Sequence, residues 1–404
     1  MSQRITGIDI GSAYIKVAIC ENVNDNSGIV VRALVKRESD GLKNGNIVNT
    51  EAVSESLLEV LHEAERVAGE RIRRAYLSVG GTGLGTVTDT STVAISRADA
   101  TASEFDIARA LEESETRQKE KANLKLLHTV MSEFRIDGRK IVGKPHGYVG
   151  NKLELKTIFL TVLAPHLDNL VNSVENTGVE VENVYAGPVA ESVATLSATS
   201  RNAGCALVNI GAETVSLLTH EDGLPTSLRV FPMGSAHITH DIALGLRISL
   251  DEAEKLKLFG SEDKRVARRI QEIIEARLSD VFELLDTHLK KIGRSGLLPA
   301  GIIFTGGGAG TRGIEELARK QLGLPAKIGR GLFTEAKTQN AEIKGLDGLR
   351  GKERVEKARG PEWASVIGLA MLGLSLGEPE ESLGLRVVKG TKKGLVSFIR
   401  QFLP

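Results

Sequence analysis

Apolar and polar residues alternate in two short stretches of the chain that resemble each other. Residues 5–20 read ITGIDIGSAYIKVAIC, and residues 205–219 read CALVNIGAETVSLLT. In each stretch an apolar run leads into a turn that contains glycine, and a second apolar run follows. This is the pattern of a β-hairpin. Because Asp9 and Asn209 occupy the same place in the two patterns, we predict a chain built from two related halves.

Helical periodicity follows each hairpin. Residues 51–69 carry apolar side chains at helical spacing and end on Gly69, a favourable C-cap. The longest amphipathic helical pattern covers residues 264–292. Directly after it, residues 296–323 read as a strand, a glycine loop and a helix. These segments predict a mixed α/β protein.

Strand-like alternation returns in residues 83–165. Three strand patterns, TVTDTSTVAIS, LKLLHTVMSEFRIDGRKI and KLELKTIFLTVLAP, are interrupted by one helical pattern, SEFDIARALEESETRQ. The pair Asp137-Gly138 marks a turn. We therefore predict a small α/β unit inserted in the first half.

Composition limits the class of protein. At 404 residues the chain is too long for one small core, so several domains or subdomains are expected. Lys plus Arg equals Asp plus Glu at 52 each, which favours no nucleic-acid partner. Cys20 and Cys205 are the only cysteines, which fits a reducing compartment. The sequence shows neither a signal-peptide pattern nor an apolar window of about 18 residues, so we expect a cytoplasmic body that does not span a membrane.

The first hairpin turn carries the chemistry of a phosphate site. Glycine lets backbone N–H groups approach anionic oxygens, so Gly11 and Ser12 are expected to touch phosphates. Lys16 on the following strand brings an ammonium group, and Asp9 is placed to hold Mg²⁺ through water. The same residues also fit a plain hairpin with a solvent-facing lysine.

A second glycine-rich segment is Gly306, Gly307 and Gly308, between a strand and a helix. Three glycines let the backbone lie flat against a planar ligand such as adenosine, although tight packing alone also explains them. Glu254 and Lys257 lie three residues apart on one helical face, where they either bind a ribose or base edge or form an exposed ion pair.

Together these motifs resemble the actin/Hsp70/sugar-kinase ATPase superfamily and, within it, the FtsA family of bacterial cell-division proteins. GIDIGSAYIKVAI is similar to the superfamily's first phosphate loop, LVNIGAETVSLL to its second, and GIIFTGGGAGTRGIEELA to its adenosine loop. GNIVNTEAVSESLLEVLHEAERVAG and FRIDGRKIVGKPHGYVGNKLEL resemble FtsA in particular.

The resemblance covers nearly the whole chain and implies its fold class. This is an α/β actin-like ATPase fold, with two duplicated halves flanking a nucleotide cleft, an inserted small α/β subdomain called 1C, and a C-terminal amphipathic helix. The implied boundaries are 1–82 and 166–190 for subdomain 1A, 83–165 for 1C, 191–227 and 300–376 for 2A, 228–299 for 2B, 377–394 for a flexible linker, and 395–404 for the membrane-targeting helix.

The resemblance also assigns residues to Mg²⁺ and ATP, while it leaves the catalytic residues unknown. The implied phosphate contacts are Gly11, Ser12, Lys16, Gly211, Thr214 and Gly234. The implied adenosine contacts are Glu254, Lys257, Gly306, Gly307 and Gly308. Asp9 and Asn209 would hold Mg²⁺ through water.

One departure from the superfamily pattern affects the expected activity. The second phosphate loop usually opens with Asp, whereas here Asn209 opens it, and Ala212 and Glu213 stand where glycine-like residues are common. Because Asn lacks a carboxylate, we expect ATP binding with weak or absent ATPase activity. We also expect Asn209→Asp to raise hydrolysis.

The resemblance implies a scaffold that polymerises on the inner face of the cytoplasmic membrane and tethers filaments of FtsZ at the division site. Its implied partners are the FtsZ C-terminal peptide on subdomain 2B, further copies of itself, anionic lipids and other division proteins. A small-metabolite kinase of the same superfamily and an actin-like pilus-assembly protein are the alternatives. We find no convincing carboxylate base for a kinase.

The last eleven residues, GLVSFIRQFLP, form an amphipathic helical pattern. The residues before them are mostly polar and rich in glycine, which favours a tethered interfacial anchor over a helix docked in the core. The residues expected at the membrane are Leu395, Val396, Phe398, Ile399, Phe402, Leu403, Lys392, Lys393 and Arg400.

Overall fold

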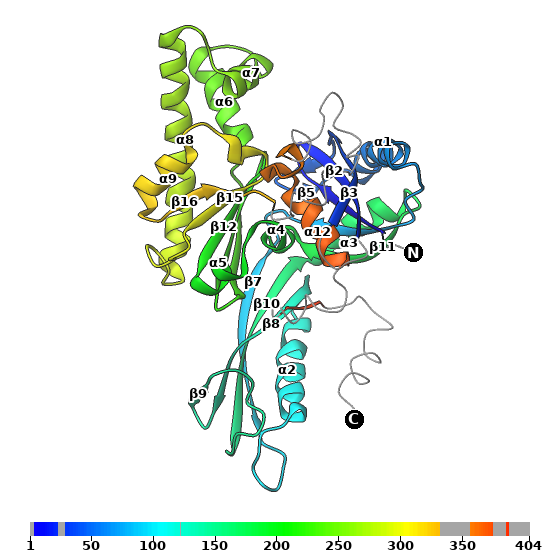
Figure 1. The fold of residues 1–404 in the computed structure, drawn as a ribbon, viewed down its shortest axis with the longest axis vertical. Helices are drawn as coiled ribbons and strands as arrows, with labels where there is room; N and C mark the ends of the chain where they lie inside the picture. Colours follow the sequence, from blue (N-terminus) through cyan, green and yellow to red (C-terminus); the bar gives the residue numbers. More distant parts are fainter. Residues whose placement is uncertain (1–3, 23–28, 122, 332–355, 375–384, 388–404) are drawn as a thin grey trace.

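The computed structural model describes residues 4–22, 29–121, 123–331, 356–374 and 385–387 (Figure 1). The predicted membrane anchor, 395–404, and the residues Lys392 and Lys393 lie outside this part of the chain. None of the helices described is long and apolar enough to cross a membrane.

Most of the described residues belong to regular elements. The strands are β1 (Arg4–Ile10), β2 (Tyr14–Asn22), β3 (Ile29–Glu38), β4 (Leu42–Lys43), β5 (Asn46–Ile47), β6 (Arg74–Val79), β7 (Gly85–Ala94), β8 (Leu124–Ile136), β9 (Arg139–Ile141), β10 (Lys152–Leu163), β11 (Glu180–Ala186), β12 (Cys205–Ile210), β13 (Val215–Glu221), β14 (Leu224–Phe231), β15 (Ile302–Thr305), β16 (Ala326–Ile328) and β17 (Leu385–Val387). The helices are α1 (Thr50–Ala68), α2 (Glu104–Lys119), α3 (Ala164–Glu175), α4 (Gly187–Thr195), α5 (Ala198–Ala203), α6 (Ser235–Leu246), α7 (Leu250–Phe259), α8 (Lys264–Lys291), α9 (Ile314–Leu322) and α12 (Ala364–Leu374), with short 3-10 turns η1 (Gly307–Gly310) and η2 (Pro361–Trp363).

Two sheets follow one plan. The first has the strand order β11-β6-β1-β2-β3, and the second contains the order β16-β15-β12-β13-β14. In each, an antiparallel hairpin (β1–β2 or β12–β13) has a parallel strand on one side and an antiparallel strand on the other. Asp9 pairs with Lys16 in the first hairpin and Asn209 with Ser216 in the second. The two predicted hairpins therefore lead two related halves.

Helices cover both faces of each sheet. Helix α12 packs on β1, β2 and β6 of the first sheet, and it also packs on α4, which contacts β12 and β13 of the second sheet. This helix pair therefore lies between the two sheets (Figure 1). A side chain at Gly368 of α12 would collide with the backbone of Ala190 in α4, so glycine permits this close crossing.

The helices predicted from periodicity are present. Asn49 caps the N-terminus of α1 by accepting from the backbone N–H groups of Glu51 and Ala52, and Gly69 ends the helix with φ of 74°. Helix α8 buries a stripe of apolar side chains in the hydrophobic cluster that also contains residues of β12, β13 and β15. Together with α6 and α7 it forms the lobe at the top of Figure 1. The buried members of the stripe are Ile270, Ile274, Leu278, Val281, Phe282, Leu285 and Leu289.

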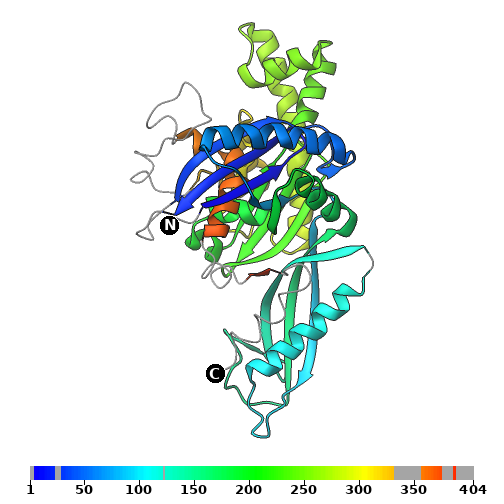
Figure 2. The ribbon, with the colours of Figure 1, turned by 90° about the vertical axis from the view of Figure 1, so that its right-hand side faces the viewer.

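The inserted unit extends from the second sheet. Strand β7 joins that sheet beside β14 through Arg229 and Gly85, and β10 and β8 continue it. Both views place this unit at the end of the molecule opposite to α6–α8, with α2 along one face of its strands (Figure 2). It has its own hydrophobic cluster, which consists of Val93, Ala102, Ile107, Ala110, Leu111, Phe134, Ile136, Leu153 and Leu155.

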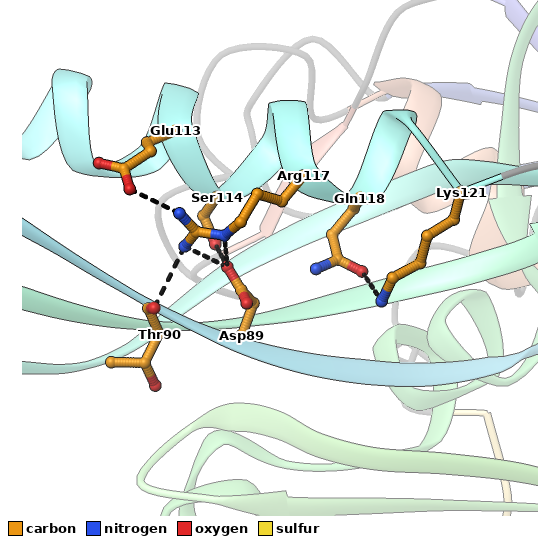
Figure 3. A network of polar contacts seen from close by, with 7 residues as sticks. All are labelled: Asp89, Thr90, Glu113, Ser114, Arg117, Gln118 and Lys121. Carbon is orange, nitrogen blue, oxygen red and sulfur yellow. Dashed lines mark hydrogen bonds and ion pairs between the residues drawn. The ribbon is translucent and has the colours of Figure 1, made fainter.

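A polar network fastens α2 to the inserted sheet (Figure 3). Arg117 donates from Nε and Nη2 to Oδ2 of Asp89 on β7 at 3.2 and 2.7 Å, and Ser114 donates to the same oxygen at 2.6 Å. Arg117 also donates to Glu113 at 2.6 Å. Apolar packing and this network together set the position of the helix.

Part of the predicted flexible linker, 377–394, is a strand. Residues 385–387 form β17, which pairs antiparallel with β8, so that Val387 lies opposite His128. These three residues of the predicted linker are therefore paired, because the edge of β8 offers free backbone groups that β17 satisfies. The other residues of the linker lie outside the described part.

Candidate functional site

A cleft of about 1080 Å³ lies between the two halves. Its walls come from the β1–β2 turn, the β12–β13 turn and the loop between β15 and η1. Pockets for ligands of nucleotide size commonly have volumes of several hundred Å³ or more. We refer to this cavity as the cleft.

The cleft brings together nearly all residues that the sequence analysis singled out in the body. Those that line it are Asp9, Gly11, Ser12, Lys16, Asn209, Gly211, Thr214, Glu254, Lys257, Gly306, Gly307 and Gly308. Gly234 is not among the lining residues. It lies behind the second turn, where a side chain would collide with the carbonyl oxygen of Ala212.

The first turn places opposite charges at the floor of the cleft. Asp9 and Lys16 are paired across the hairpin, with 3.7 Å between Lys16 Nζ and Asp9 Oδ2. Ser78 on β6 donates to Asp9 Oδ1 and orients that carboxylate. The backbone N–H of Gly11 donates to the Tyr14 carbonyl at 3.1 Å, which closes the turn. An ammonium and an oriented carboxylate side by side suit a phosphate chain that carries a divalent cation.

Glu191 on α4 is a cleft residue that the sequence analysis missed. It is 3% exposed, yet it lines the cleft. The Asn209 amide donates to its Oε1, and Thr305 Oγ1 donates to its Oε2 at 2.6 Å. Burial raises the pKa of Glu191 to about 7. The Asp9 carboxylate acts in the same direction, while the two hydrogen bonds and Lys16 oppose the shift. The available signal was a single acidic residue in the otherwise apolar run GPVAESVAT.

Glu213, noted in the sequence only as a departure from glycine-like residues, makes a contact between the two halves. Its Oε2 accepts from the backbone N–H of Asn44 at 2.6 Å, in the turn between β4 and β5. The next residue, Gly45, donates to Ser12 Oγ at 3.1 Å. One turn of the first half thus contacts both turns that border the cleft.

The three consecutive glycines have different environments. Gly306 has φ of 83°, and a Cβ there would lie 2.6 Å from the Ile210 carbonyl oxygen. A Cβ at Gly308 would also collide with Ile210, whereas one at Gly307 would meet nothing within 4 Å. Gly306 and Gly308 therefore allow the loop to pack on β12, and Gly307 has open space beside it.

Glu254 and Lys257 on α7 form an ion pair that lies on the cleft wall. Lys257 Nζ is 2.7 Å from Glu254 Oε2, and it donates to Thr239 Oγ1 at 2.8 Å. The lysine side chain is 9% exposed, so the pair is held by its surroundings and is only partly solvated. The ion pair considered from the sequence is therefore present, but its lysine is largely buried, and both partners line the cleft where a nucleotide role would place them.

The residues of the cleft fit a magnesium nucleotide. The cavity is open beside Gly307, glycine turns border it, and Asp9, Glu191 and Asn209 supply the oxygen atoms that Mg²⁺ prefers. Among the described residues no group of three or more His, Cys, Asp or Glu is arranged to hold a metal ion. Magnesium in nucleotide sites usually takes one or two carboxylates, and phosphates and waters complete its shell.

Two family models match the chain. The model described as "Cell division protein FtsA" matches residues 206–368, and the model described as "SHS2 domain inserted in FTSA" matches residues 81–161. The second match overlaps the unit predicted at 83–165 and confirms that a domain is inserted in the first half.

Curated proteins similar to this chain are also cell division proteins named FtsA. The cell division protein FtsA of Bacillus subtilis (strain 168) is 29% identical over 337 residues, which cover 78% of this chain and 76% of that protein. The FtsA of Pseudomonas aeruginosa is 27% identical over 392 residues, which cover 92% of this chain and 89% of that protein.

The solved structure of a PilM-PilN type IV pilus biogenesis complex superposes with a TM-score of 0.64 at 18% identity, covering 92% of this chain and 98% of that one. At this identity the likeness shows the fold alone. The predicted actin-like ATPase fold is confirmed.

Proposed function

The chain belongs to the FtsA family of cell-division proteins, and from this premise we propose that it is an ATP-binding scaffold that tethers FtsZ filaments to the inner face of the cytoplasmic membrane. The observation that carries the proposal is the cleft, where two hairpin turns from related halves and a separate glycine loop border one cavity. A single glycine turn is common, whereas three around one cavity form a built site for a phosphate chain and a planar base.

Within this proposal the first turn holds the phosphates through Gly11, Ser12 and Lys16, and the second turn through Gly211 and Thr214. Gly234 supports the second turn from behind. Asp9 and Asn209 hold Mg²⁺ through water, and the metal supplies neutralisation of phosphate charge. Glu254, Lys257 and Gly306–Gly308 border the adenosine.

We place the FtsZ C-terminal peptide on the lobe of α6, α7 and α8. This lobe exposes large apolar side chains that a peptide can cover, among them Leu244 and Phe259, each 81% exposed. Leu250 is also exposed on α7. Exposed apolar groups gathered on one small lobe are a common feature of recognition surfaces.

We place contacts between protomers on the inserted unit, 83–165. It has its own core and extends away from the cleft, so it can contact a neighbour without disturbing nucleotide binding. Phe105 at the start of α2 and Val149 are large exposed apolar residues there. Other division proteins and anionic lipids are the further proposed partners, and the residues 395–404 are the proposed lipid anchor.

A co-sedimentation assay tests the proposal. The full chain is mixed with anionic vesicles and ATP, with and without FtsZ. We expect the chain to sediment with the vesicles and to bring FtsZ into the pellet. FtsZ that stays in the supernatant while the chain pellets would contradict the tethering function. A metabolite kinase would instead transfer phosphate to a sugar or acetate in a coupled assay, and the two family models favour the division scaffold over a pilus-assembly protein.

A further inference from the structure

The side chains of Asn209 and Glu191 form a pair at the cleft. Asn209 opens the second turn, where an aspartate was expected from the resemblance, and its amide nitrogen donates to Glu191 Oε1. The two residues are 18 positions apart and come from different elements, α4 and β12. A carboxylate is therefore present beside position 209, although the sequence carries none at that position.

Burial of the Glu191 carboxylate in its ionised form is energetically unfavourable. Removing an ionised carboxylate from water costs several kcal/mol unless hydrogen bonds and charges compensate for it. Glu191 accepts one hydrogen bond on each oxygen, from Asn209 and Thr305, and among the described residues it forms no ion pair within 4 Å. Neutral donors alone compensate only in part, so a structural tie between α4 and the second sheet is a weak reason for an acid here.

The amide of Asn209 faces two ways. Its nitrogen points to Glu191, while its Oδ1 lies 2.7 Å from the place that a Cβ of Gly306 would occupy. The amide therefore lies between the buried carboxylate and the glycine loop. An aspartate at 209 would place two carboxylates in hydrogen-bond contact, and these would repel each other or share a proton.

We propose that Glu191 supplies from α4 the second carboxylate of the nucleotide site, and that Glu191 and Asn209 act as one unit that holds, through water, the divalent cation accompanying ATP. Glu191 is a positioning residue in this arrangement. The inference rests on the proposed ATP binding. It reverses the expectation for Asn209→Asp, because that change alone adds a charge next to an existing one.

The test measures how strongly Mg²⁺ improves ATP binding. Calorimetry gives the Kd of ATP in excess magnesium chloride and in EDTA, and the ratio of the two constants is the magnesium enhancement. Four full-length proteins are compared: wild type, Glu191→Gln, Asn209→Asp and the double variant. Glu191→Gln should lower the enhancement about tenfold, which corresponds to loss of one charge-assisted contact of about 1.4 kcal/mol. The affinity of the Glu191→Gln variant for ATP in EDTA should not decrease, because the substitution removes a negative group that faces the phosphates.

The double variant separates a functional from a structural role. It carries the charge at 209 and the amide at 191, so the magnesium enhancement should return to within about threefold of wild type. Asn209→Asp alone should show a reduced enhancement. Glu191→Asp, which keeps the charge on a shorter side chain, should retain part of it. Glu221→Gln, at the far end of β13 and paired with Arg294, is the matched control and should leave it unchanged.

Two results are decisive. If Glu191→Gln and the wild type have the same magnesium enhancement, and thermal denaturation shows both folded, the proposal is overturned. If the double variant shows no recovery although it is folded, the pair does not act as a unit and the proposal is also overturned. If the wild type binds no ATP at all, the proposed function is itself contradicted. This outcome differs from the case in which wild type and Glu191→Gln both bind ATP with the same magnesium enhancement.

Discussion

The carboxylate of Glu213 accepts a hydrogen bond of 2.6 Å from the backbone N–H of Asn44, although the two residues are 169 positions apart. Glu213 belongs to the second hairpin turn, and Asn44 belongs to the β4–β5 turn of the first half. The contact therefore joins the two halves at the rim of the cleft. It gives Glu213 a role at a position where the superfamily commonly carries a small residue.

We predict that Glu213→Ala weakens ATP binding by about fivefold. A typical intramolecular hydrogen bond contributes about 1 kcal/mol net, and its loss lets the rim of the cleft open more easily. Stopped-flow release of a fluorescent ATP analogue should show the change mainly as faster dissociation. Glu213→Gln keeps an acceptor oxygen and is the control. Equal release rates for the alanine variant and the wild type would show that the contact between Glu213 and Asn44 does not retain the nucleotide.

Gly306→Ala and Gly307→Ala should behave differently although they are neighbours. Gly306 has a positive φ and no space for a Cβ, so its substitution should lower the free energy of unfolding by at least about 2 kcal/mol. Gly307 has open space, so its variant should keep wild-type stability and lose ATP affinity if the methyl group occupies space that the proposed adenosine needs. Urea denaturation and calorimetry measure the two effects. A stable Gly306→Ala protein would show that the loop packing is not required.

The stability of the body should fall in mild acid because of buried histidines. Burial lowers the pKa of His128 to about 3, and its Nε2 accepts from the backbone N–H of Ala186 at 3.0 Å. The unfolded chain binds a proton near pH 6.5 and the folded chain does not, so stability is complete above pH 6.5. It is lost as the pH falls from 6.5 toward 3, by at most about 1.4 kcal/mol per pH unit for one group.

His128→Gln keeps an acceptor and cannot titrate, so the acid loss of stability should be shallower in this variant. Burial also lowers the pKa of His220 to about 3, and this residue contributes with the same sign. The raised pKa of Glu191, about 7, contributes with the opposite sign between pH 7 and 4.5, so the comparison with wild type, and not the remaining slope, isolates His128. Chemical denaturation at several pH values between 7 and 4.5 gives the slope. An unchanged slope would mean that His128 is not buried in its neutral form.

Arg117→Ala should loosen the inserted unit and leave the cleft intact. The substitution removes the contacts of Arg117 with Asp89, which hold α2 on β7 (Figure 3). Hydrogen exchange of the α2 amides should become faster, in line with a local loss of about 1–2 kcal/mol, and ATP affinity should stay the same. Lys119→Ala removes only an exposed i,i+4 pair with Glu115 and should change exchange very little. Slower filament assembly by Arg117→Ala is expected if this unit joins protomers.

The terminal segment should bind membranes through its apolar face. Changing Phe398 and Phe402 to Glu should release the protein from anionic vesicles while ATP binding is retained, because two charges replace the side chains that enter the interface. Changing Ser397 and Gln401 to Glu adds the same charge on the polar face and should reduce binding much less. Retention of the first variant on vesicles at wild-type levels would exclude this anchor.

Several features of the fold could be predicted from local patterns in the sequence. The two hairpins follow from alternation on either side of a glycine turn, and α1 follows from helical spacing between a capping Asn49 and Gly69. The long α8 and the strands of the inserted unit follow in the same way. These patterns are readable because secondary structure depends on residues a few positions apart, whose side chains share a face or cap a helix end.

Other features depend on residues that are distant in the chain. The contact of Glu191 with Thr305 spans 114 positions, and that of Asn44 with Glu213 spans 169. The packing of Gly306 on Ile210, the place of Gly234 behind the second turn and the pairing of β17 with β8 are of the same kind. Local periodicity carries no information on which elements meet, since that depends on how two sheets and the helices between them pack. The turns of the cleft could thus be predicted from the sequence. The Glu191 carboxylate could be assigned to the cleft only from the tertiary structure, because its place there depends on the packing of α4 against β12.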